Sequence, residues 1–210
     1  MIVAVSMRVV EAVGYSERRD ATSHDLVRFL VHMGGTPLLI PNAPDTEAYL
    51  ARFKFDRLVL SGGEDIASDI TGSVARITNL RDRTERRLLD AATARGLPVL
   101  GICRGAMFLN QYLGGGLTHD LESVIGEEHV AKPHEIHLWN GRTAVTNSFH
   151  RHGILLRQLA PELRQLAVTQ GGTVEAFRSQ SGRLLGLMWH PERLGSASEV
   201  DRELMGAWLK

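Results

Sequence analysis

Hydrophobic residues in the first half of the chain fall into two alternating patterns. Short continuous apolar runs are typical of strands that are buried on both faces of a sheet. Apolar residues three and four positions apart indicate amphipathic helices. Because such strands alternate with such helices, we expect right-handed βαβ units and a mostly parallel sheet. The predicted strands are 2–6, 36–40, 58–60 and 98–102, and the predicted helices are 23–33, 83–95 and 104–113.

The second half of the chain is richer in short strands that are joined by turns. Its turn signals, Asn140-Gly141, Gly171-Gly172 and Ser181-Gly182, favour additional antiparallel strands. The predicted strands are 136–139, 143–146, 174–178 and 184–188, followed by an amphipathic helix over 198–209. No linker rich in proline, glycine or serine interrupts the pattern. We therefore expect an α/β fold in one domain that spans residues 1–210.

The composition is that of an ordinary globular protein. Of the 210 residues, 43% are apolar and 23% are charged, and 24 basic residues balance 24 acidic ones. A net charge of zero provides no bulk field for nucleic acid or for an anionic membrane. The one cysteine rules out an intramolecular disulfide, and the first residues lack the features of a signal peptide. We expect a cytoplasmic protein that binds neither nucleic acid nor membrane.

Cys103 lies where a predicted strand turns into a predicted helix. Gly101 and Gly105 flank it, and a sharp turn that carries a nucleophile requires such small neighbours. The turn would place the thiol at the carboxyl end of the sheet, where open α/β folds bind ligands. The helix N-terminus would favour the thiolate, which is the form that attacks. A buried, inert cysteine is the alternative, but strand, glycines and helix start together favour a nucleophile.

His190 and Glu192 are the candidate base and orienting group for this thiol. A nucleophilic cysteine needs a base, and the base needs a group that holds its ring. Pro191 favours an extended backbone at His190. Side chains two apart on an extended segment share a face, so Glu192 would reach the imidazole nitrogen that turns away from Cys103. The alternative is a strand-end histidine beside a solvated glutamate.

Two glycines after the strand 58–60 are the candidate oxyanion site. Attack on an amide carbonyl creates an oxyanion, which two fixed N–H groups can stabilise. Arg104, the residue after the nucleophile, would supply one N–H group. Gly63 would supply the other, while Gly62 would allow the backbone to approach closely. An ordinary turn at the end of a strand would also explain the two glycines.

Several motifs in fixed order resemble those of class I glutamine amidotransferase-like hydrolases. They are Leu58-Val59-Leu60-Ser61-Gly62-Gly63-Glu64-Asp65-Ile66, Arg81-Asp82 with Glu85, the segment 101–105 and the segment 189–192. Within that superfamily, Thr146-Asn147-Ser148-Phe149-His150 followed by Val174-Glu175-Ala176 is similar to the γ-glutamyl-γ-aminobutyrate hydrolase branch, peptidase family C26. The resemblance runs from the first strand to Glu192 and covers most of the chain.

The resemblance implies a flavodoxin-like, three-layer α/β/α sandwich. It implies a γ-glutamyl thioester on Cys103, with His190 and Glu192 completing a triad, and oxyanion donors at Gly63 and Arg104. The residues that it places at the substrate are Gly62, Met107, Asn147, Ser148, Phe149 and His150. The sequence gives no sign of an organic cofactor, and we expect none. We also expect no metal, because His134, His137, His150 and His152 lack acidic or cysteine partners in a recognisable ligand pattern.

The identity of the substrate depends on weaker signals. Many family members have a glutamine four residues after the nucleophile, where it helps to hold glutamine; here Met107 cannot donate such hydrogen bonds. Arginines near predicted loop ends either meet an anionic leaving group or form a solvated basic surface. They are Arg8, Arg18, Arg19, Arg81, Arg83, Arg104 and Arg151. The short chain and the segment 188–193 resemble hydrolases that remove glutamate from γ-glutamyl-CDP-amidate in capsule phosphoramidate synthesis.

The expected activity is therefore cysteine-dependent release of glutamate from a γ-glutamyl amide, with γ-glutamyl-CDP-amidate as the favoured substrate. The alternatives are a γ-glutamyl-GABA-type hydrolase, a glutaminase subunit that passes ammonia to a synthase, a catalytically silent binding module and a protease that acts on polypeptides. The expected partner is a small γ-glutamyl molecule, nucleotide-linked in the favoured case. The sequence leaves the oligomeric state open, with a homodimer among the choices.

Overall fold

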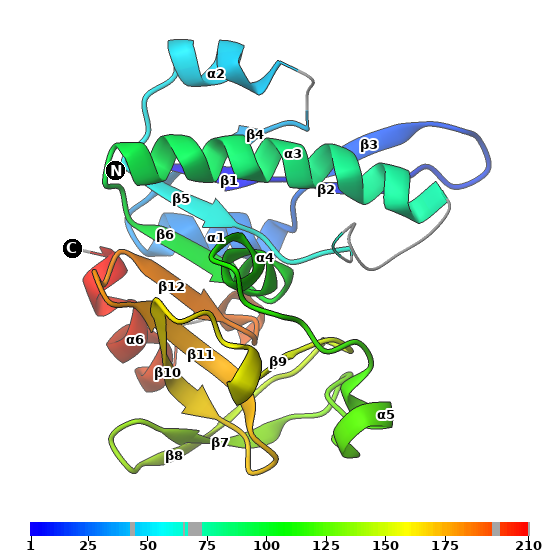
Figure 1. The fold of residues 1–210 in the computed structure, drawn as a ribbon. Helices are drawn as coiled ribbons and strands as arrows, with labels where there is room; N and C mark the ends of the chain where they lie inside the picture. Colours follow the sequence, from blue (N-terminus) through cyan, green and yellow to red (C-terminus); the bar gives the residue numbers. More distant parts are fainter. Residues whose placement is uncertain (43–44, 65, 67–72, 195–197, 210) are drawn as a thin grey trace.

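One mixed sheet forms the centre of the molecule (Figure 1). The computed structural model describes residues 1–42, 45–64, 66, 73–194 and 198–209. The strands of the sheet are β1 (Ile2–Ser6), β4 (Thr36–Ile40), β5 (Arg57–Leu60), β6 (Val99–Ile102), β7 (His134–Leu138), β8 (Thr143–Thr146), β9 (Ile154–Leu155), β10 (Leu163–Val168), β11 (Thr173–Ser179) and β12 (Leu184–Leu187). Their order in the described part of the chain is β4-β1-β5-β6-β12-β11-β10-β7-β8, and β9 pairs with β11.

The sheet has a parallel half and an antiparallel half. Strands β4, β1, β5, β6 and β12 pair in parallel. Strands β11, β10, β7 and β8 continue the sheet with antiparallel pairing. This division agrees with the βαβ pattern predicted for the first half of the chain and with the turn signals in the second half.

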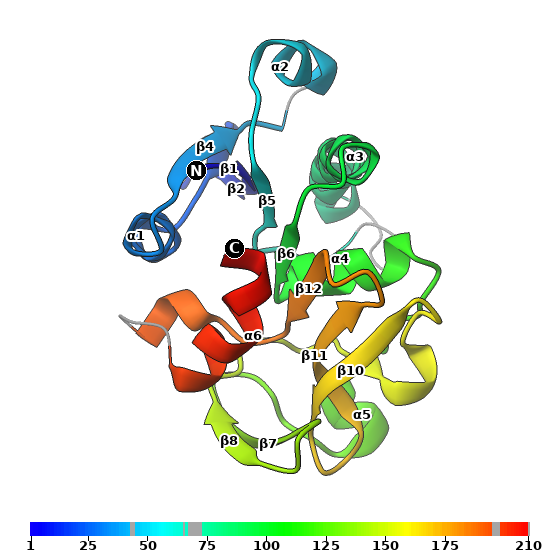
Figure 2. The ribbon, with the colours of Figure 1, turned by 90° about the vertical axis from the view of Figure 1, so that its left-hand side faces the viewer.

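Helices cover both faces of the parallel half (Figure 2). The helices are α1 (His24–His32) and α6 (Glu199–Leu209) on one face, and α3 (Ser73–Ala94) and α4 (Arg104–Tyr112) on the other. Alternate residues of a strand point to opposite faces. Accordingly, Val3 and Val5 belong to the core under α1 and α6, whereas Ala4 belongs to the core under α3 and α4. The arrangement is the three-layer α/β/α sandwich that the resemblance implied.

The predicted elements are present, and most of their ends differ by one or two residues. Helix α3 is the exception, because it begins at Ser73, ten residues before the predicted start at position 83. Strand β10 was not predicted, since a bulge between Gln165 and Ala167 breaks its alternation of buried and exposed residues. Short helical elements were also not predicted, and they are α2 (Thr46–Arg52), α5 (Leu121–Ile125), η2 (Leu156–Gln158) and η3 (Pro191–Leu194).

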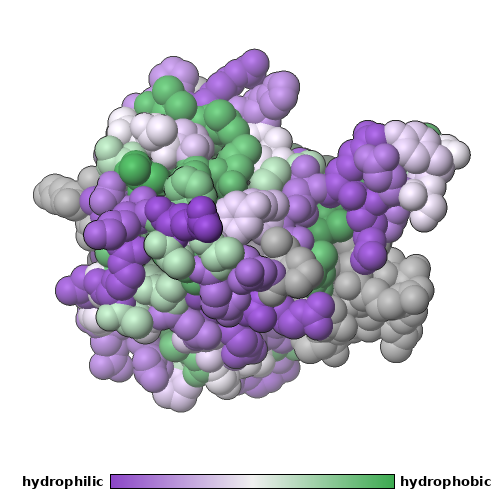
Figure 3. Space-filling model, turned by 90° about the horizontal axis from the view of Figure 1, so that it is seen from above, coloured by the Kyte–Doolittle hydropathy of each residue, from purple (hydrophilic) through white to green (hydrophobic). Residues whose placement is uncertain are grey.

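A two-stranded hairpin that the sequence did not reveal projects beside the sheet. Its strands are β2 (Arg8–Glu11) and β3 (Arg18–Ala21). Viewed from above in Figure 3, the hairpin stands out at the right with mainly hydrophilic side chains, so no apolar alternation marks it. Asn42 anchors its base, because its backbone N–H donates to Asp20 Oδ2 at 2.8 Å and its side-chain amide donates to the Met7 carbonyl at 2.8 Å.

The carboxyl ends of β1, β5, β6 and β12 meet at one edge of the sheet. The parallel register places Leu60 beside Gly101, and Ile102 beside Leu187. The residues that follow these strands, Ser61, Cys103 and the segment 188–190, therefore come together although they are distant in sequence. In the described part of the chain, no helix has the length and apolar character needed to cross a membrane.

Candidate active site

Cys103 joins β6 to α4 in a strained backbone conformation. Its φ of 52° and ψ of −108° lie in a region that residues other than glycine rarely adopt. A Cβ atom on Gly105 would lie 2.1 Å from the Leu60 carbonyl oxygen, and one on Gly101 would lie 2.6 Å from the Gly105 carbonyl oxygen. The sequence prediction of a sharp strand-to-helix turn with two required glycines is therefore confirmed.

His190 lies between Cys103 and Glu192. Its Nδ1 is 2.7 Å from Glu192 Oε1, and its side chain also hydrogen-bonds the Cys103 thiol. Because Glu192 engages Nδ1, Nε2 is the ring nitrogen left to face the sulfur. All three side chains are buried and line one cavity. The structure thus brings the three predicted residues into one hydrogen-bonded series.

Glu192 reaches His190 by a backbone path that differs from the predicted one. The expectation that both side chains share a face of an extended segment is wrong, because Glu192 lies in the 3₁₀ helix η3. The segment before η3 is fixed from α6, since Trp189 Nε1 donates to Asp201 Oδ1 at 2.7 Å. Both side chains of this hydrogen bond are buried. The tight turn of η3, and not strand geometry, therefore brings the carboxylate to the ring.

The thiol and the imidazole stabilise each other's charged forms. Burial raises the pKa of the Cys103 thiol, but the hydrogen bond and charge of His190 outweigh burial and lower that pKa below its usual value. Burial also acts to lower the pKa of His190, yet Cys103 and Glu192 raise it to about 9. The backbone N–H of Arg104 donates to the sulfur as well. The site therefore favours the thiolate beside an imidazolium over the neutral pair.

A buried arginine holds the turn that follows β5. Arg81 Nη2 donates to the carbonyl oxygens of Ser61 at 2.6 Å and Gly62 at 3.2 Å. In a trans peptide the carbonyl and the following N–H point in opposite directions, so the Gly63 N–H turns away from Arg81. A Cβ on Gly62 would lie 2.8 Å from His190 Cε1, and Gly63 has a φ of 145°. Glycine at both positions lets this turn lie against the His190 ring. Asp65, from the same motif, lies outside the described residues.

Two cavities in the described structure meet at Cys103. The larger, of about 350 Å³, extends from Cys103 to the β2–β3 hairpin and to the start of α1. The smaller, of about 230 Å³, extends from Cys103 to Met107 and His150. Phe149 lines both cavities, and its ring centroid is 5.9 Å from that of His190. Two surfaces, one on each side of the thiol, are thus available to the two halves of an amide substrate.

The residues predicted at the substrate divide into two groups. Gly62, Met107, Phe149 and His150 line one or both of these cavities, whereas Asn147 and Ser148 line neither. Asn147 instead holds the backbone of His190. Its Nδ2 donates to the His190 carbonyl at 2.8 Å, and its Oδ1 accepts from the His190 N–H at 2.9 Å. These two hydrogen bonds give Asn147 a positioning role at the imidazole.

The arginines also divide into buried and accessible groups. The guanidinium groups of Arg81 and Arg104 are buried in ion pairs with Glu85, so these two belong neither to a solvated surface nor to the free cations of the cavities. Arg8 lines the larger cavity and Arg151 lines the smaller one. Arg193, which the sequence analysis did not single out, also lines the larger cavity, with its guanidinium 4.2 Å from the Phe149 ring centroid. Its place directly after Glu192 was the available signal.

A group of histidines near the smaller cavity also differs from expectation. The prediction that His134 and His150 lack an acidic partner is wrong, because Glu175 faces both. His129, which the sequence analysis did not consider, faces the same carboxylate. The available signal was Glu175 itself, a charged residue between Val174 and Ala176 in a buried part of β11. His129, His134 and Glu175 together could hold a metal ion.

Comparisons with known proteins agree with the architecture. The model of the family described as Peptidase C26 matches residues 1–192. Protein NtpR of Enterococcus hirae is 32% identical over 215 residues, which cover 90% of this chain and 88% of that protein. The γ-glutamyl-CDP-amidate hydrolase of Campylobacter jejuni is 26% identical over 212 residues, which cover 100% of this chain and 98% of that protein. A glutamine amidotransferase from Thermotoga maritima has a similar fold, with a TM-score of 0.61 and 16% identity over 99% of this chain and 80% of that chain.

Proposed function

The chain belongs to the peptidase C26 family of glutamine amidotransferase-like hydrolases, and on that premise we propose that it hydrolyses a γ-glutamyl amide through a thioester on Cys103. The observation that carries the proposal is the hydrogen-bonded series of Cys103, His190 and Glu192 beside a cavity. A lowered thiol pKa and a raised imidazole pKa supply a nucleophile and an acid together.

The proposed reaction has two steps. The Cys103 thiolate attacks the γ-carbonyl carbon, a C–S bond forms, and the C–N bond breaks while the His190 imidazolium gives its proton to the leaving amine. A water molecule then attacks the thioester, His190 takes a proton from that water, and the C–S bond breaks to release glutamate. The N–H groups of Gly63 and Arg104 would stabilise the oxyanion in both steps.

The two cavities suggest how the substrate is divided. We assign the γ-glutamyl part to the smaller cavity, because Met107 stands where the family resemblance places a residue that holds glutamine. The leaving group then occupies the larger cavity, which Arg8 and Arg193 line. Glu64 also lines it, but Arg81 neutralises that carboxylate from 2.8 Å away.

We propose γ-glutamyl-CDP-amidate as the substrate. Guanidinium groups match phosphate oxygens in charge and geometry, so Arg8 and Arg193 suit a diphosphate in the larger cavity. The Campylobacter jejuni relative, which is named for this substrate, aligns over 98% of its length. γ-Glutamyl-GABA and free glutamine have leaving groups without a phosphate, and they are the comparison substrates.

Glutamate release from these three compounds tests the proposal. We expect the purified chain to turn over γ-glutamyl-CDP-amidate with a kcat/KM at least about 10-fold above the other two, because charge-assisted hydrogen bonds discriminate by this much or more. Equal or faster turnover of γ-glutamyl-GABA or glutamine would contradict the nucleotide-linked substrate. No release from any of the three, under conditions where the chain is folded, would contradict the hydrolase itself and favour a silent binding module.

Covalent labelling separates the remaining alternatives. A γ-glutamyl electrophile such as 6-diazo-5-oxonorleucine should add one label to Cys103, and Cys103→Ser should remain unlabelled. If glutaminase activity appeared only on addition of a synthase partner, the glutaminase-subunit alternative would replace the proposed hydrolase.

A further inference from the structure

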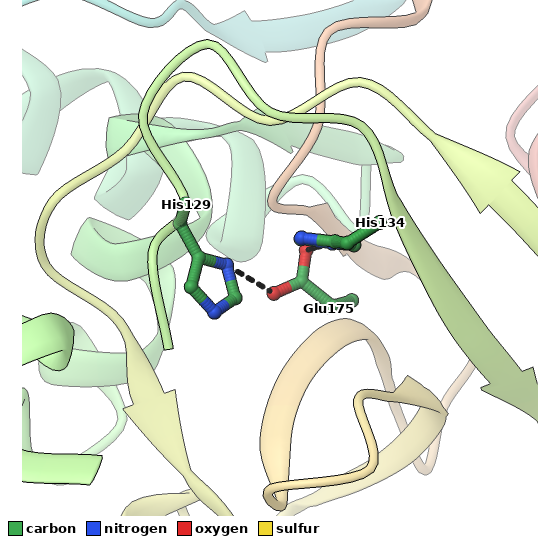
Figure 4. A group of neighbouring side chains, drawn as sticks. All are labelled: His129, His134 and Glu175. Carbon is green, nitrogen blue, oxygen red and sulfur yellow. Dashed lines mark ion pairs between the residues drawn. The ribbon is translucent and has the colours of Figure 1, made fainter. Parts of the chain in front are cut away.

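Near the smaller cavity, three histidines surround one buried carboxylate. Glu175 lies on β11 with its side chain fully buried. His129 Nδ1 is 3.5 Å from Glu175 Oε1, and His134 Nε2 is 3.3 Å from Glu175 Oε2. His150 Nε2 lies 3.6 Å from the same Oε2. Figure 4 shows the Glu175 carboxylate between the rings of His129 and His134. The proposed hydrolysis uses neither Glu175 nor the rings of His129 and His134.

The facing atoms of this group are not satisfied by hydrogen bonds. Within the described part of the chain, both oxygens of Glu175, both ring nitrogens of His134, Nδ1 of His129 and Nε2 of His150 are buried without a hydrogen-bond partner. Their separations exceed the usual N–H···O distance of about 2.7–3.2 Å. Burying a carboxylate without a close partner is strongly unfavourable. The three histidines are the ion-pair partners of this carboxylate, and a metal ion between these atoms would satisfy them more closely than the present contacts do.

In His129 and His150, the outer ring nitrogen, which faces away from Glu175, determines whether the inner one, which faces Glu175, carries a proton. His129 Nε2 is 3.0 Å from Glu127 Oε2, and His150 Nδ1 is 2.9 Å from the His152 carbonyl oxygen. A carboxylate and a carbonyl only accept hydrogen bonds, so both outer nitrogens carry a proton. In the neutral rings, the inner nitrogens of His129 and His150 consequently aim lone pairs at the Glu175 carboxylate. Lone pairs that face each other at this distance are stabilised by a cation between them, which is either a ring proton or a metal ion.

Glu127 is itself held in place around His129. Its oxygens accept from Thr169 Oγ1 at 2.9 Å, from Thr173 Oγ1 at 3.1 Å and from the Gly171 N–H at 2.7 Å. A carboxylate that orients a histidine through its outer nitrogen is typical of metal sites in proteins. A Cβ at Gly171 would lie 2.0 Å from Glu127 Oε1, so glycine there leaves room for the carboxylate in this position. The hydrogen bonds around Glu127 thus hold the His129 ring in a fixed orientation, as is usual for a metal ligand.

We propose that His129, His134 and Glu175 bind one zinc ion, with the Nε2 atom of His150 facing the fourth position. Four ligands around zinc at bonds of 2.0–2.2 Å are separated from one another by roughly 3.4 Å. His134 Nε2 lies 3.3 Å from Oε2 and His129 Nδ1 lies 3.5 Å from Oε1, so each histidine is close to that separation from one oxygen of the carboxylate. Imidazole nitrogens with one carboxylate suit zinc, whereas calcium and magnesium prefer oxygen ligands.

The proposed site has a route to solvent and a connection to the active site. A cavity of about 250 Å³ is lined by His129 and His134, and 17% of the His134 side chain is exposed. His150 belongs both to this group and to the wall of the smaller cavity beside Cys103. A bound zinc ion would therefore fix one wall of the cavity that we assign to the γ-glutamyl group, without taking part in the bond changes there.

Calorimetric titration with zinc chloride tests the proposal independently of catalysis. The full chain should carry Cys103→Ala, because a thiolate beside an imidazole is itself a zinc ligand. We expect one zinc per chain after prior dialysis against a chelator, and the intense visible absorption of tetrahedral Co²⁺ on titration with cobalt. His134→Gln and Glu175→Gln should each weaken the zinc affinity by at least about 10-fold. His32→Gln, at an exposed histidine of α1, should leave it unchanged.

Each other outcome would overturn the proposal. Zinc that binds the native chain but not the Cys103→Ala variant would place the ion at the active-site thiol. Undiminished affinity in His134→Gln would exclude this ligand set, and His134 is only partly buried, so that variant should keep its fold by circular dichroism. An absence of zinc binding to the folded chain would indicate that extra protons, not a metal ion, compensate Glu175. None of these results bears on glutamate release, so failure here is distinguishable from failure of the proposed hydrolase.

Discussion

The geometry around Cys103 shows how single residues create reactivity. A positive φ at a residue with a side chain costs about 1–3 kcal/mol, and the chain retains it at the thiol, where φ is 52°. The strain turns the sulfur toward His190 and toward the Arg104 N–H. Substitutions at this scale should therefore change chemistry far more than stability.

Substitution of the three hydrogen-bonded residues should give a graded loss of activity. Cys103→Ala should abolish glutamate release, and His190→Asn should reduce kcat by at least about 10⁴-fold. Glu192→Gln should cost roughly 100-fold less than the loss of the nucleophile, because an orienting group contributes less than the group that it orients. Steady-state kinetics measures these values. Equal losses at all three positions, accompanied by loss of the circular dichroism signal, would mean that these are core residues.

The rate of hydrolysis should have a bell-shaped dependence on pH. Protonation of the Cys103 thiolate removes the nucleophile on the acidic side, below the lowered thiol pKa. Loss of the His190 proton removes the acid on the alkaline side, near the imidazole pKa of about 9. Both limbs belong to the coupled pair. Glu192→Gln should move the alkaline limb to lower pH, because the Glu192 carboxylate raises that pKa. If the alkaline limb of the kcat/KM profile stays at the same pH or moves to higher pH in Glu192→Gln, His190 is not the acid that this limb reports.

Among the elements, the turn after β5 connects a buried charge network to the His190 ring. Arg81 donates to the turn carbonyls and pairs with Glu85, and Glu85 also accepts from Ser6 Oγ at 2.7 Å. Glu85 pairs with Arg104 as well, the residue that follows the nucleophile. One buried carboxylate on α3 thus supports both segments that carry the proposed oxyanion donors.

Gly62→Ala should reduce kcat/KM by about 100-fold while the fold is retained. Its added methyl group would lie 2.8 Å from His190 Cε1, and a displacement of about 1 Å at an active site can cost this much in rate. The matched control is Gly206→Ala in α6, where a Cβ meets nothing within 4 Å and alanine favours a helix over glycine by about 1 kcal/mol. Kinetics and thermal melts of both variants check the prediction. Unchanged activity in Gly62→Ala would show that the turn does not constrain the ring.

Glu85→Gln should lower the free energy of unfolding by about 3–5 kcal/mol, because it removes the one fully buried carboxylate that pairs with both Arg81 and Arg104 and leaves each with a single acidic partner, Glu64 or Asp82. The control on the same helix is Asp90→Asn, whose exposed hydrogen bond to Tyr112 should be worth less than about 1.5 kcal/mol. Urea unfolding at neutral pH measures both values. A loss no larger than that of the control would contradict the role of Glu85.

At acidic pH, the free energies of unfolding of the native chain and of the Glu85→Gln variant should differ less than at neutral pH. Burial raises the Glu85 pKa, but Arg104 and Arg81 outweigh burial and hold it below its ordinary value of 4.5. A carboxyl group with a depressed pKa stabilises the fold at pH values above its pKa in the unfolded chain. This stabilisation is lost as the pH falls toward its pKa in the folded protein. If urea unfolding well below pH 4.5 still gave the full difference in free energy of unfolding, the ion pairs of Glu85 would not be the cause of that difference.

At the scale of the whole molecule, the sheet order determines which distant segments share a cavity. The hairpin before α1, the turn after β5 and the segment after β12 all line the larger cavity. The parallel strands between them bring these segments to one edge, as open α/β sheets generally do. Specificity for the leaving group should therefore depend on residues from both ends of the chain.

Arg8→Gln and Arg193→Gln should each raise the KM for γ-glutamyl-CDP-amidate by about 10-fold or more, because each removes a charge-assisted contact. The KM for γ-glutamyl-GABA should change less, since its leaving group carries one carboxylate in place of a diphosphate. Arg18→Gln, at an exposed arginine of β3, serves as the control. Steady-state kinetics with both substrates measures the effect. Equal changes for the two substrates would contradict a diphosphate in the larger cavity.

Local features of the sequence determined most elements and the candidate nucleophile. Apolar periodicity and glycine turns depend on neighbours in the chain, so β1, β4, α4 and the turn at Cys103 could be predicted within one or two residues. The β2–β3 hairpin and the bulged β10 escaped prediction, because their stability comes from pairing with other segments and not from their own pattern.

Only the tertiary structure decided which polar residues meet. In the sequence, Arg81 and Arg104 look the same as Arg8, yet the guanidinium groups of the first two are buried against Glu85, whereas Arg8 lines the larger cavity. Glu175 meets His134 through the order of strands β11, β10 and β7, which no local pattern encodes. The sequence by itself therefore determined the elements and the candidate nucleophile. Which charged groups pair with one another was decided by the tertiary structure, because such pairs form between segments that are far apart in the chain.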